Sequence, residues 1–354
     1  MSNKELICKR RRTSIGGQAL MEGIMMRGPK KNAMAVRRPN GEIYFEENQN
    51  EQKKRPRITR LPIVRGVFNF VESMVIGYKS LMRSADIAME DEAQETGEKA
   101  PSKGAMNALM VVATVLGVAL AVLLFMWLPS FLYSVMARFT PDAWGLASNR
   151  YLRSIFEGVL KIVVLVAYMA IVSLMKDIRR TFMYHGAEHK TIFCYEQGLP
   201  LTVENVKKQQ RFHPRCGTSF LILMLLVSIG IGLLIPAELP FASGIFYTVV
   251  RALIKLLLLP LVMGIGYELL KFAGRHDNLF TRIISAPGMW LQRITVKEPT
   301  DDMIECAVKA FIAVLPEDEI ASETLAAYGN SVTSEAQECD TVVDDVTENT
   351  DAQA

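Results

Sequence analysis

The sequence predicts a mostly α-helical protein, a polytopic membrane bundle of about four transmembrane helices with a small N-terminal β-hairpin element and cytoplasmic helices. Three observations predict this fold class: long segments without charge, an uneven distribution of Lys and Arg, and an Asn-Gly turn between two short alternating runs. Of the 354 residues, 50% are hydrophobic and 22% are charged, which excludes a disordered chain. Five Cys are too few for a disulfide scaffold.

The N-terminal region, residues 1–60, is predicted to be a β-rich cytoplasmic segment. A Pro-Asn-Gly turn at residues 39–41 separates NAMAVRR from EIYFEE, and Asn-Gly between alternating runs is a strong hairpin signal. The sequence GGQALMEGIMMRGP lies upstream, and its glycines predict turns around a short buried strand. Residues 61–105 follow as an amphipathic helix over residues 62–88, which lies on the membrane surface or packs on the bundle, and a mobile linker over residues 90–104.

Four segments are long and apolar enough to cross a bilayer, whose core of about 30 Å needs roughly 20 helical residues. The four segments are residues 106–128, 155–175, 219–237 and 246–270. The first and third carry no charge, whereas the second contains Glu157 and Lys161 and the fourth contains Arg251 and Lys255. Together they predict a membrane bundle over residues 106–275.

The charges inside the second and fourth segments have two interpretations. Glu157 and Lys161 are spaced i, i+4, as are Arg251 and Lys255, so each pair lies on one helical face. The first interpretation is snorkelling together with an ion pair between the two helices. The second is a polar path for a transported ion or solute.

The positions of Lys and Arg predict the orientation, because cytoplasmic segments carry an excess of them. Residues 1–105 hold 20, residues 176–218 hold eight and residues 271–309 hold six. The connection 130–154 holds three, and 236–250 holds none. We therefore expect both termini and the central loop to be cytoplasmic.

The C-terminal region divides into two parts. Residues 276–315 are predicted to be a cytoplasmic segment with a short helix that begins near Thr300, where Asp301 and Asp302 favour a helix N-terminus. Residues 316–354 contain eleven acids and no Lys or Arg, which predicts a disordered acidic tail. The small net charge of +3 therefore conceals a basic body with an acidic tail.

The loop 176–218 holds the residues typical of a metal site. It contains three of the four His of the chain, and His185-Gly-Ala-Glu188-His189 fits the pattern H-x-x-E-H. On a helix His185 and His189 lie one turn apart on one face, so both imidazoles can reach one metal ion. Glu188 lies beside them, where it can act as the catalytic general base. Glu196 follows on the same stripe as a further candidate.

Further metal ligands come from the end of this loop, where His213 and Cys216 precede the third predicted span. These donor types match Zn²⁺ best. If only one of these two residues binds the metal, the site keeps an open coordination position and can be catalytic. If both bind it, the site has four protein ligands and is structural. The alternative without metal is a set of hydrogen-bonded His at a basic membrane interface.

Several motifs together resemble one known family. GGQALMEGIMMRGP, YHGAEHKTIFCYE, HPRCGTSF, GYELLKFAG and APGMWLQRITVKEPTDDMIECAV stand in this order between about Ser14 and Phe311. The chain resembles the YqhQ-like bacterial membrane proteins, the DUF1385 family, which are labelled predicted metal-dependent enzymes. The resemblance implies one site that unites the His, Cys and Glu residues of the loop with Glu22 and Glu268, but it implies no reaction.

The two additional carboxylates also have structural interpretations. Glu268 lies at the cytoplasmic end of the fourth span, where it serves the site as a ligand or an outer partner. It can equally cap the bundle or pair with Lys271. Glu22 is a ligand if the Gly-rich segment folds onto the loop, and otherwise it pairs with Arg27 across a turn.

Three functional hypotheses follow. The first is a zinc-dependent hydrolase at the cytoplasmic membrane surface. The alternative is a non-enzymatic membrane assembly or scaffold protein with a structural metal site. The third hypothesis, a transporter, rests only on the charges within the spans.

The expected partners are the lipid bilayer and its anionic headgroups. No nucleic acid is expected, because the basic run at residues 9–12 fits lipid or topology in a membrane protein. The sequence names no protein partner and allows a homo-oligomer.

Overall fold

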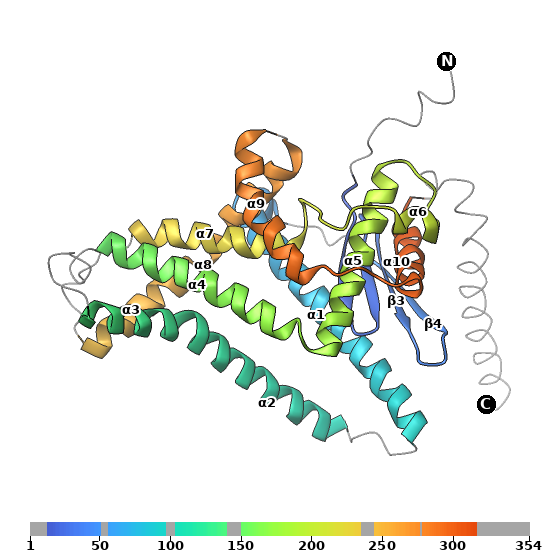
Figure 1. Ribbon diagram of the computed structural model, residues 1–354, viewed down its shortest axis with the longest axis horizontal. Helices are drawn as coiled ribbons and strands as arrows, with labels where there is room; N and C mark the ends of the chain where they lie inside the picture. The colour runs from blue at the N-terminus through green and yellow to red at the C-terminus, as the bar shows by residue number, and fades with distance from the viewer. Residues whose placement is uncertain are drawn as a thin grey trace.

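The computed structural model describes residues 13–50, 56–96, 103–139, 150–234, 244–276 and 278–316. Nearly all of the predicted acidic tail, and residues 97–102 of the predicted linker, lie outside these ranges. The described part is mostly helical, with one sheet near the N-terminus. Figure 1 shows two ends: apolar helices lie side by side at one end, and the sheet lies at the other.

The sheet has four antiparallel strands in the order β1-β2-β3-β4. The strands are β1 (Gly16–Leu20), β2 (Gly23–Arg27), β3 (Lys31–Arg37) and β4 (Ile43–Gln49). The predicted hairpin is confirmed as β3 and β4, with Gly41 at the turn in the left-handed region (φ 89°), which favours glycine. The Gly-rich segment upstream, predicted to hold one short strand, supplies two.

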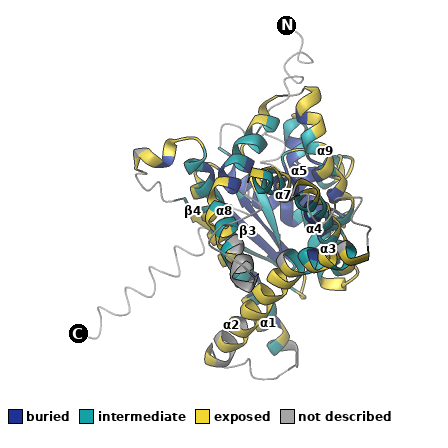
Figure 2. Cartoon of the chain, turned by 90° about the vertical axis from the view of Figure 1, so that its left-hand side faces the viewer, coloured by how far each residue is buried: buried dark blue, intermediate teal, exposed yellow. Residues whose placement is uncertain are grey.

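Both faces of the sheet are covered, which explains why β2 is buried along most of its length. Ile24 and Met26 point into a core with α10 (Asp301–Val314). Met25 points to the other face, where it belongs to a smaller core with Ile87 of α1 (Val64–Thr96). Successive side chains of a strand alternate between faces, so two apolar layers need two covering helices. Figure 2 shows buried residues gathered around β3 and α5, whereas exposed residues predominate along α2.

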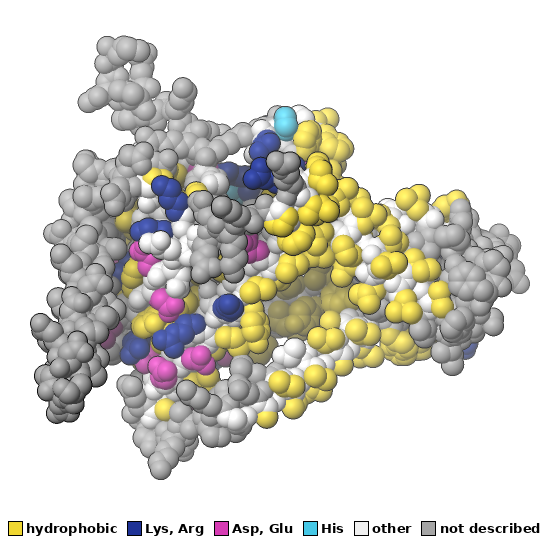
Figure 3. All heavy atoms as spheres, turned by 180° about the vertical axis from the view of Figure 1, so that it is seen from behind, with side chains coloured by type: hydrophobic (Ala, Val, Ile, Leu, Met, Phe, Trp, Pro, Cys, Tyr) yellow, Lys and Arg dark blue, Asp and Glu magenta, His cyan; other side chains and the backbone are white. Residues whose placement is uncertain are grey.

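Four candidate membrane spans are present among the described residues, and the predicted bundle is confirmed. They are Val111–Met136, Tyr151–Val172, Gly217–Leu234 and Leu253–Arg275. The first runs through α2 (Lys103–Val122), the π-helical η2 (Leu123–Trp127) and α3 (Leu128–Phe139); the others belong to α4 (Arg150–Val172), α7 (Gly217–Leu234) and α8 (Gly244–Arg275). Figure 3 shows hydrophobic side chains over this end of the molecule and charged ones over the other.

The helix α1 packs on the bundle, which is one of the two positions expected for it. Gly66 faces Gly264 of α8, and a Cβ added at Gly264 would lie 2.3 Å from Cγ2 of Ile63. Glycine at these positions therefore lets the two helices approach closely. The short helix η1 (Arg57–Arg60) precedes α1. The helix itself continues to Thr96, through residues that the sequence assigned to the linker.

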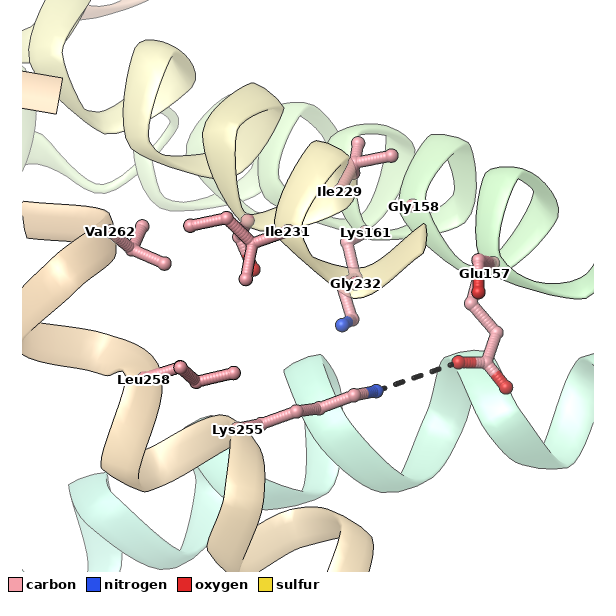
Figure 4. A pocket seen from close by; sticks show the side chains of 11 residues that line it. Glu157, Gly158, Lys161, Ile229, Ile231, Gly232, Lys255, Leu258 and Val262 are labelled. Carbon is pink, nitrogen blue, oxygen red and sulfur yellow. Dashed lines mark ion pairs between the residues drawn. The ribbon is translucent and has the colours of Figure 1, made fainter. Parts of the chain in front are cut away.

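The charges within the bundle form an ion pair between the second and fourth spans. Oε1 of Glu157 accepts a hydrogen bond from Nε of Arg153 (2.9 Å), and Oε2 lies 3.9 Å from Nζ of Lys255 in α8. Lys161 and Lys255 both line a cavity of about 40 Å³ between α4, α7 and α8 (Figure 4). The side chain of Arg251 lies outside the described residues. A cavity of this size holds a few water molecules at most.

Candidate metal centre

The first part of the expected loop is a long helix, α5 (Lys176–Glu196), that crosses the sheet end of the molecule. It ends before Gly198, whose positive φ of 70° supplies the left-handed residue that commonly terminates a helix. Its central turns are buried against β1 and α10, with Tyr184 at 0% exposure and His189 at 1%. The helix therefore holds His185 and His189 in fixed positions, one turn apart on the same face.

Three side chains gather their donor atoms in one place. His185 and His189 lie one turn apart on α5, and Cys216 is the residue before α7. One donor atom from each lies within 4.8 Å of the other two, and Nε2 of His185 is 3.1 Å from Sγ of Cys216. This group could hold a metal ion.

The outer contacts orient both histidines toward this point. Nδ1 of His185 donates to the carbonyl of Thr295 (3.0 Å), and Nδ1 of His189 donates to the carbonyl of Arg211 (2.5 Å). A carbonyl only accepts, so each Nδ1 carries the proton and each Nε2 keeps a free lone pair. Nε2 of His189 is buried and has no hydrogen-bond partner in the part of the chain that the structure describes. A buried nitrogen left without a partner is costly, and a metal ion would satisfy it, so the donors fit a metal.

Electrostatics around His189 agree with this arrangement. Burial lowers the pKa of His189, although its neighbour Cys216 opposes the change. A neutral imidazole is the form that binds a metal. Cys216 lies at the N-terminus of α7, and the backbone N–H of Thr218 donates to its sulfur (3.4 Å). The positive end of the helix thus points at the third donor.

Glu188 lies beside the donor group but does not belong to it. Its Oε1 accepts a hydrogen bond from the backbone N–H of Gly17 in β1 (2.8 Å). Burial raises the pKa of Glu188, while His185 and the Gly17 N–H lower it by less. A Cβ at Gly17 would lie 3.0 Å from Cδ of Glu188 and 2.8 Å from the carbonyl of Met25. The Gly-rich segment therefore folds onto α5, and glycine permits the contact.

The structure places His213 and Glu196 next to the donors rather than among them. The ring of His213 is 5.7 Å from that of His189, but its Nε2 is 3.7 Å from Oε2 of Glu196. Glu196 also accepts hydrogen bonds from Arg215 and from the backbone N–H of Thr13 (3.1 Å). Burial alone would raise the pKa of Glu196, but the neighbouring His213 and Arg215 outweigh it and lower that pKa. Glu196 therefore belongs to a separate contact with His213 and Arg215.

Glu22 and Glu268 are both engaged elsewhere. Glu22 pairs with Arg180 near the start of α5. Arg27, the other partner considered for Glu22, pairs with Glu72 of α1 at 2.7 Å. Glu268 accepts from Nε of Arg65 in α1 (2.6 Å), so it joins α8 to α1. Among the described residues, neither carboxylate belongs to the donor group.

We expect Glu22→Gln and Glu268→Gln to leave the metal content of the purified protein unchanged. Both side chains are partly exposed, and such ion pairs contribute about 0–1 kcal/mol. Metal analysis of the two variants beside the unsubstituted protein checks this. A loss of metal in either variant would show that the substituted carboxylate contributes to the metal site after all.

Some residues of the site carried no signal in the sequence. Thr295 and Arg211 act through backbone carbonyls, which every residue has. Gln292 accepts from the backbone N–H of His213 (2.8 Å) and donates to its carbonyl (2.8 Å). Gln292 is fully buried in α9 (Leu279–Thr295). In the sequence, the signal for its role is a single amide side chain on the apolar face of that helix.

The fold and the donor group define a class: a protein with four candidate membrane spans and a His–His–Cys group where α5 meets the start of α7. Residues 61–317 match the family model described as protein of unknown function (DUF1385), and the chain belongs to this family. It is 34% identical over 306 residues to the uncharacterized protein YqhQ of Bacillus subtilis (strain 168). That alignment covers 85% of this chain and 92% of that protein. No solved structure matches the chain.

Proposed function

We propose that the protein is a zinc-dependent hydrolase that works at the cytoplasmic surface of the bacterial membrane. One observation carries the proposal: His185, His189 and Cys216 converge, and within the described ranges the buried Nε2 of His189 has no hydrogen-bond partner. Two nitrogens and one sulfur suit zinc better than ions that prefer oxygen ligands. The high Lys and Arg content of the segments beside the site supports a cytoplasmic location for it and for both termini.

Three protein ligands leave one coordination position open, which is the arrangement of catalytic zinc sites. When bound there, zinc lowers the pKa of a water molecule and polarises a carbonyl or phosphoryl oxygen. Glu188 follows His185 by three residues on α5 and so lies on the same side of the helix. Its carboxylate would take a proton from the attacking water, while the Gly17 N–H holds Oε1 in place.

The second candidate is a membrane assembly or scaffold protein with a structural metal. The observation that favours it is the position of His213, whose ring lies 5.7 Å from that of His189 and whose backbone is held by Gln292. A fourth ligand from His213 would close the coordination sphere and leave no position for a substrate.

Glu188→Gln separates these candidates, because it removes the base but none of the three donors. We expect the variant to bind zinc like the unsubstituted protein and to lose about 10²- to 10⁴-fold in hydrolytic rate, the usual contribution of a general base. Zinc content and hydrolysis of chromogenic esters and phosphoesters by the zinc-loaded protein in nanodiscs measure the two effects.

Asp177→Asn is a matched control, since Asp177 lies in the first turn of α5, away from the donors. Unchanged hydrolysis in Glu188→Gln, or zinc-loaded protein inactive on every substrate class, would favour the structural metal. Absence of stoichiometric zinc from the unsubstituted protein would remove both candidates.

A further inference from the structure

The helix α9 exposes a large apolar face, although it lies next to the candidate metal centre. Four large side chains on it are more than half exposed in the isolated chain. They are Leu279 (75%), Phe280 (55%), Ile283 (62%) and Trp290 (67%). Leu279, Ile283 and Trp290 are spaced by four and seven residues, and Phe280 precedes Ile283 by three, so the four side chains lie on one side of the helix. Exposed apolar surface of this extent marks contact with another apolar phase or partner.

The opposite face of α9 is wedged between two spans. Leu291 shares a core with Leu165 of α4 and Ile222 of α7, and Gly288 lies so close to Ser219 that an added Cβ would be 2.6 Å from its Cα. Ile222 lies five residues inside α7, and Leu165 lies seven residues before the end of α4. At 1.5 Å per residue, the buried face of α9 thus reaches about 7–10 Å inside the ends of these spans.

The start of α9 lies close to the end of the fourth span. The fourth span ends at Arg275, and α9 begins at Leu279. The apolar face is continuous with the hydrophobic surface of the spans in the space-filling view (Figure 3). Arg282 and Arg293 lie on the exposed side as well, and the guanidinium of Arg293 lies 5.7 Å from the ring centre of Trp290. Trp and Arg beside apolar residues are typical of helices at the membrane interface.

We propose that α9 is inserted into the bilayer interface, with its four apolar side chains among the acyl chains and Arg282 and Arg293 at anionic headgroups. The depth of the buried face of α9 below the ends of the spans carries this inference. A single helix is thin, so the side chains on its exposed face lie at a similar depth. A helix in this position typically sinks about 5–10 Å below the headgroup boundary.

The inserted helix also holds the candidate metal centre. The carbonyl of Thr295 orients His185, and Gln292 fixes the backbone of His213. Directly after α9, the backbone N–H of Lys297 donates to the carbonyl of Phe182 in α5 (2.9 Å). The position of α9 in the lipid is therefore transmitted to α5. The effect on metal binding rests on the proposed function; the insertion itself does not.

Single-tryptophan fluorescence measures the insertion. The chain has three Trp, so Trp127→Phe together with Trp144→Phe leaves Trp290 alone. In nanodiscs of phosphatidylglycerol and phosphatidylcholine, we expect lipids brominated near the headgroup to quench Trp290 at least about twofold more strongly than lipids brominated deep in the chain. The matched control keeps only Trp127, in the first span, where deep bromines should quench more. If the double variant does not fold, Trp290→Phe alone should remove the shallow component from the native signal.

Two outcomes would overturn the insertion. Quenching of Trp290 by aqueous acrylamide but not by brominated lipid would place the helix in water. Protection from both quenchers would place it against protein, such as a second copy of the chain. Arg282→Gln with Arg293→Gln should reduce the difference in shallow quenching between discs with and without phosphatidylglycerol, and an unchanged difference would remove the anionic headgroups from the proposal.

Cobalt(II) titration tests the link to the metal centre. Ile283→Glu should weaken cobalt binding about 10- to 100-fold, as loss of outer support for a ligand does. Val75→Glu, at an exposed apolar position of α1, is the control that should bind normally. Unchanged affinity in Ile283→Glu would refute the coupling. If Trp290 shows shallow quenching while the unsubstituted protein binds no cobalt, only the proposed function fails.

Discussion

Cys216→Ser should abolish stoichiometric zinc binding, whereas His213→Ala should retain it. Cys216 supplies the only sulfur among the three converging donors, and its Sγ is 3.1 Å from Nε2 of His185. We expect the affinity for zinc to fall by more than the roughly 100-fold that the loss of an outer contact costs. His213 faces Glu196 instead, so its removal should cost about 10-fold at most. Competition with a chelator of known affinity measures both.

The cobalt(II) spectrum provides an independent test of the same donors. A thiolate ligand gives a charge-transfer band, which should be present in the unsubstituted protein and in His213→Ala and absent from Cys216→Ser. If His213→Ala loses metal as completely as Cys216→Ser, the site has four protein ligands and the structural interpretation gains. If Cys216→Ser binds zinc normally, the donor group is not a metal site.

Gly186→Ala should destabilise the fold by at least about 3 kcal/mol, at the upper end of the usual cost of overpacking. A Cβ at Gly186 would lie 1.9 Å from the carbonyl oxygen of Lys297 and 3.3 Å from Cδ of Pro299. The obstacle is backbone, so relief requires that α5 move away from the segment after α9. His185 is the adjacent residue, so its bond to Thr295 should be disturbed together with the packing.

Thermal unfolding in detergent measures this effect, with Gly230→Ala as the matched control. Gly230 also lies within a helix, but a Cβ there meets nothing within 4 Å. Its replacement should be neutral or slightly stabilising, because alanine has the better helix propensity. Equal unfolding temperatures for the two variants would contradict the close contact between α5 and Lys297.

The spans, the turn at Gly41 and the one-turn spacing of His185 and His189 could be predicted because each depends on residues close together in the chain. The choice between Cys216 and His213 as third donor could not. Both follow α5 at a similar distance, and the choice depends on how α9 holds His213 through Gln292. That contact joins residues 79 positions apart and leaves no periodic pattern.

The same limit explains the two additional carboxylates. Glu22 pairs with Arg180 across 158 residues, and Glu268 pairs with Arg65 across 203. From the sequence alone, only partners a few residues away could be proposed, namely Arg27 and Lys271, because an ion pair between distant elements depends on the tertiary arrangement. The extent of burial of α10 could not be predicted for the same reason. Its amphipathic pattern predicts one buried face, but the sheet and α5 enclose its whole central part.

The main core of the sheet end is assembled from three chain segments that the membrane spans separate. They are the sheet at 16–49, α5 at 176–196 and α10 at 301–314. During synthesis, Ile24 and Met26 therefore remain without α10 until about 280 further residues have been made, which takes roughly 14–56 s at the usual rate of about 5–20 residues per second. The His–His–Cys group likewise gains its α9 support only after the last span has been made. Completion of the site would thus report that all four spans have been inserted.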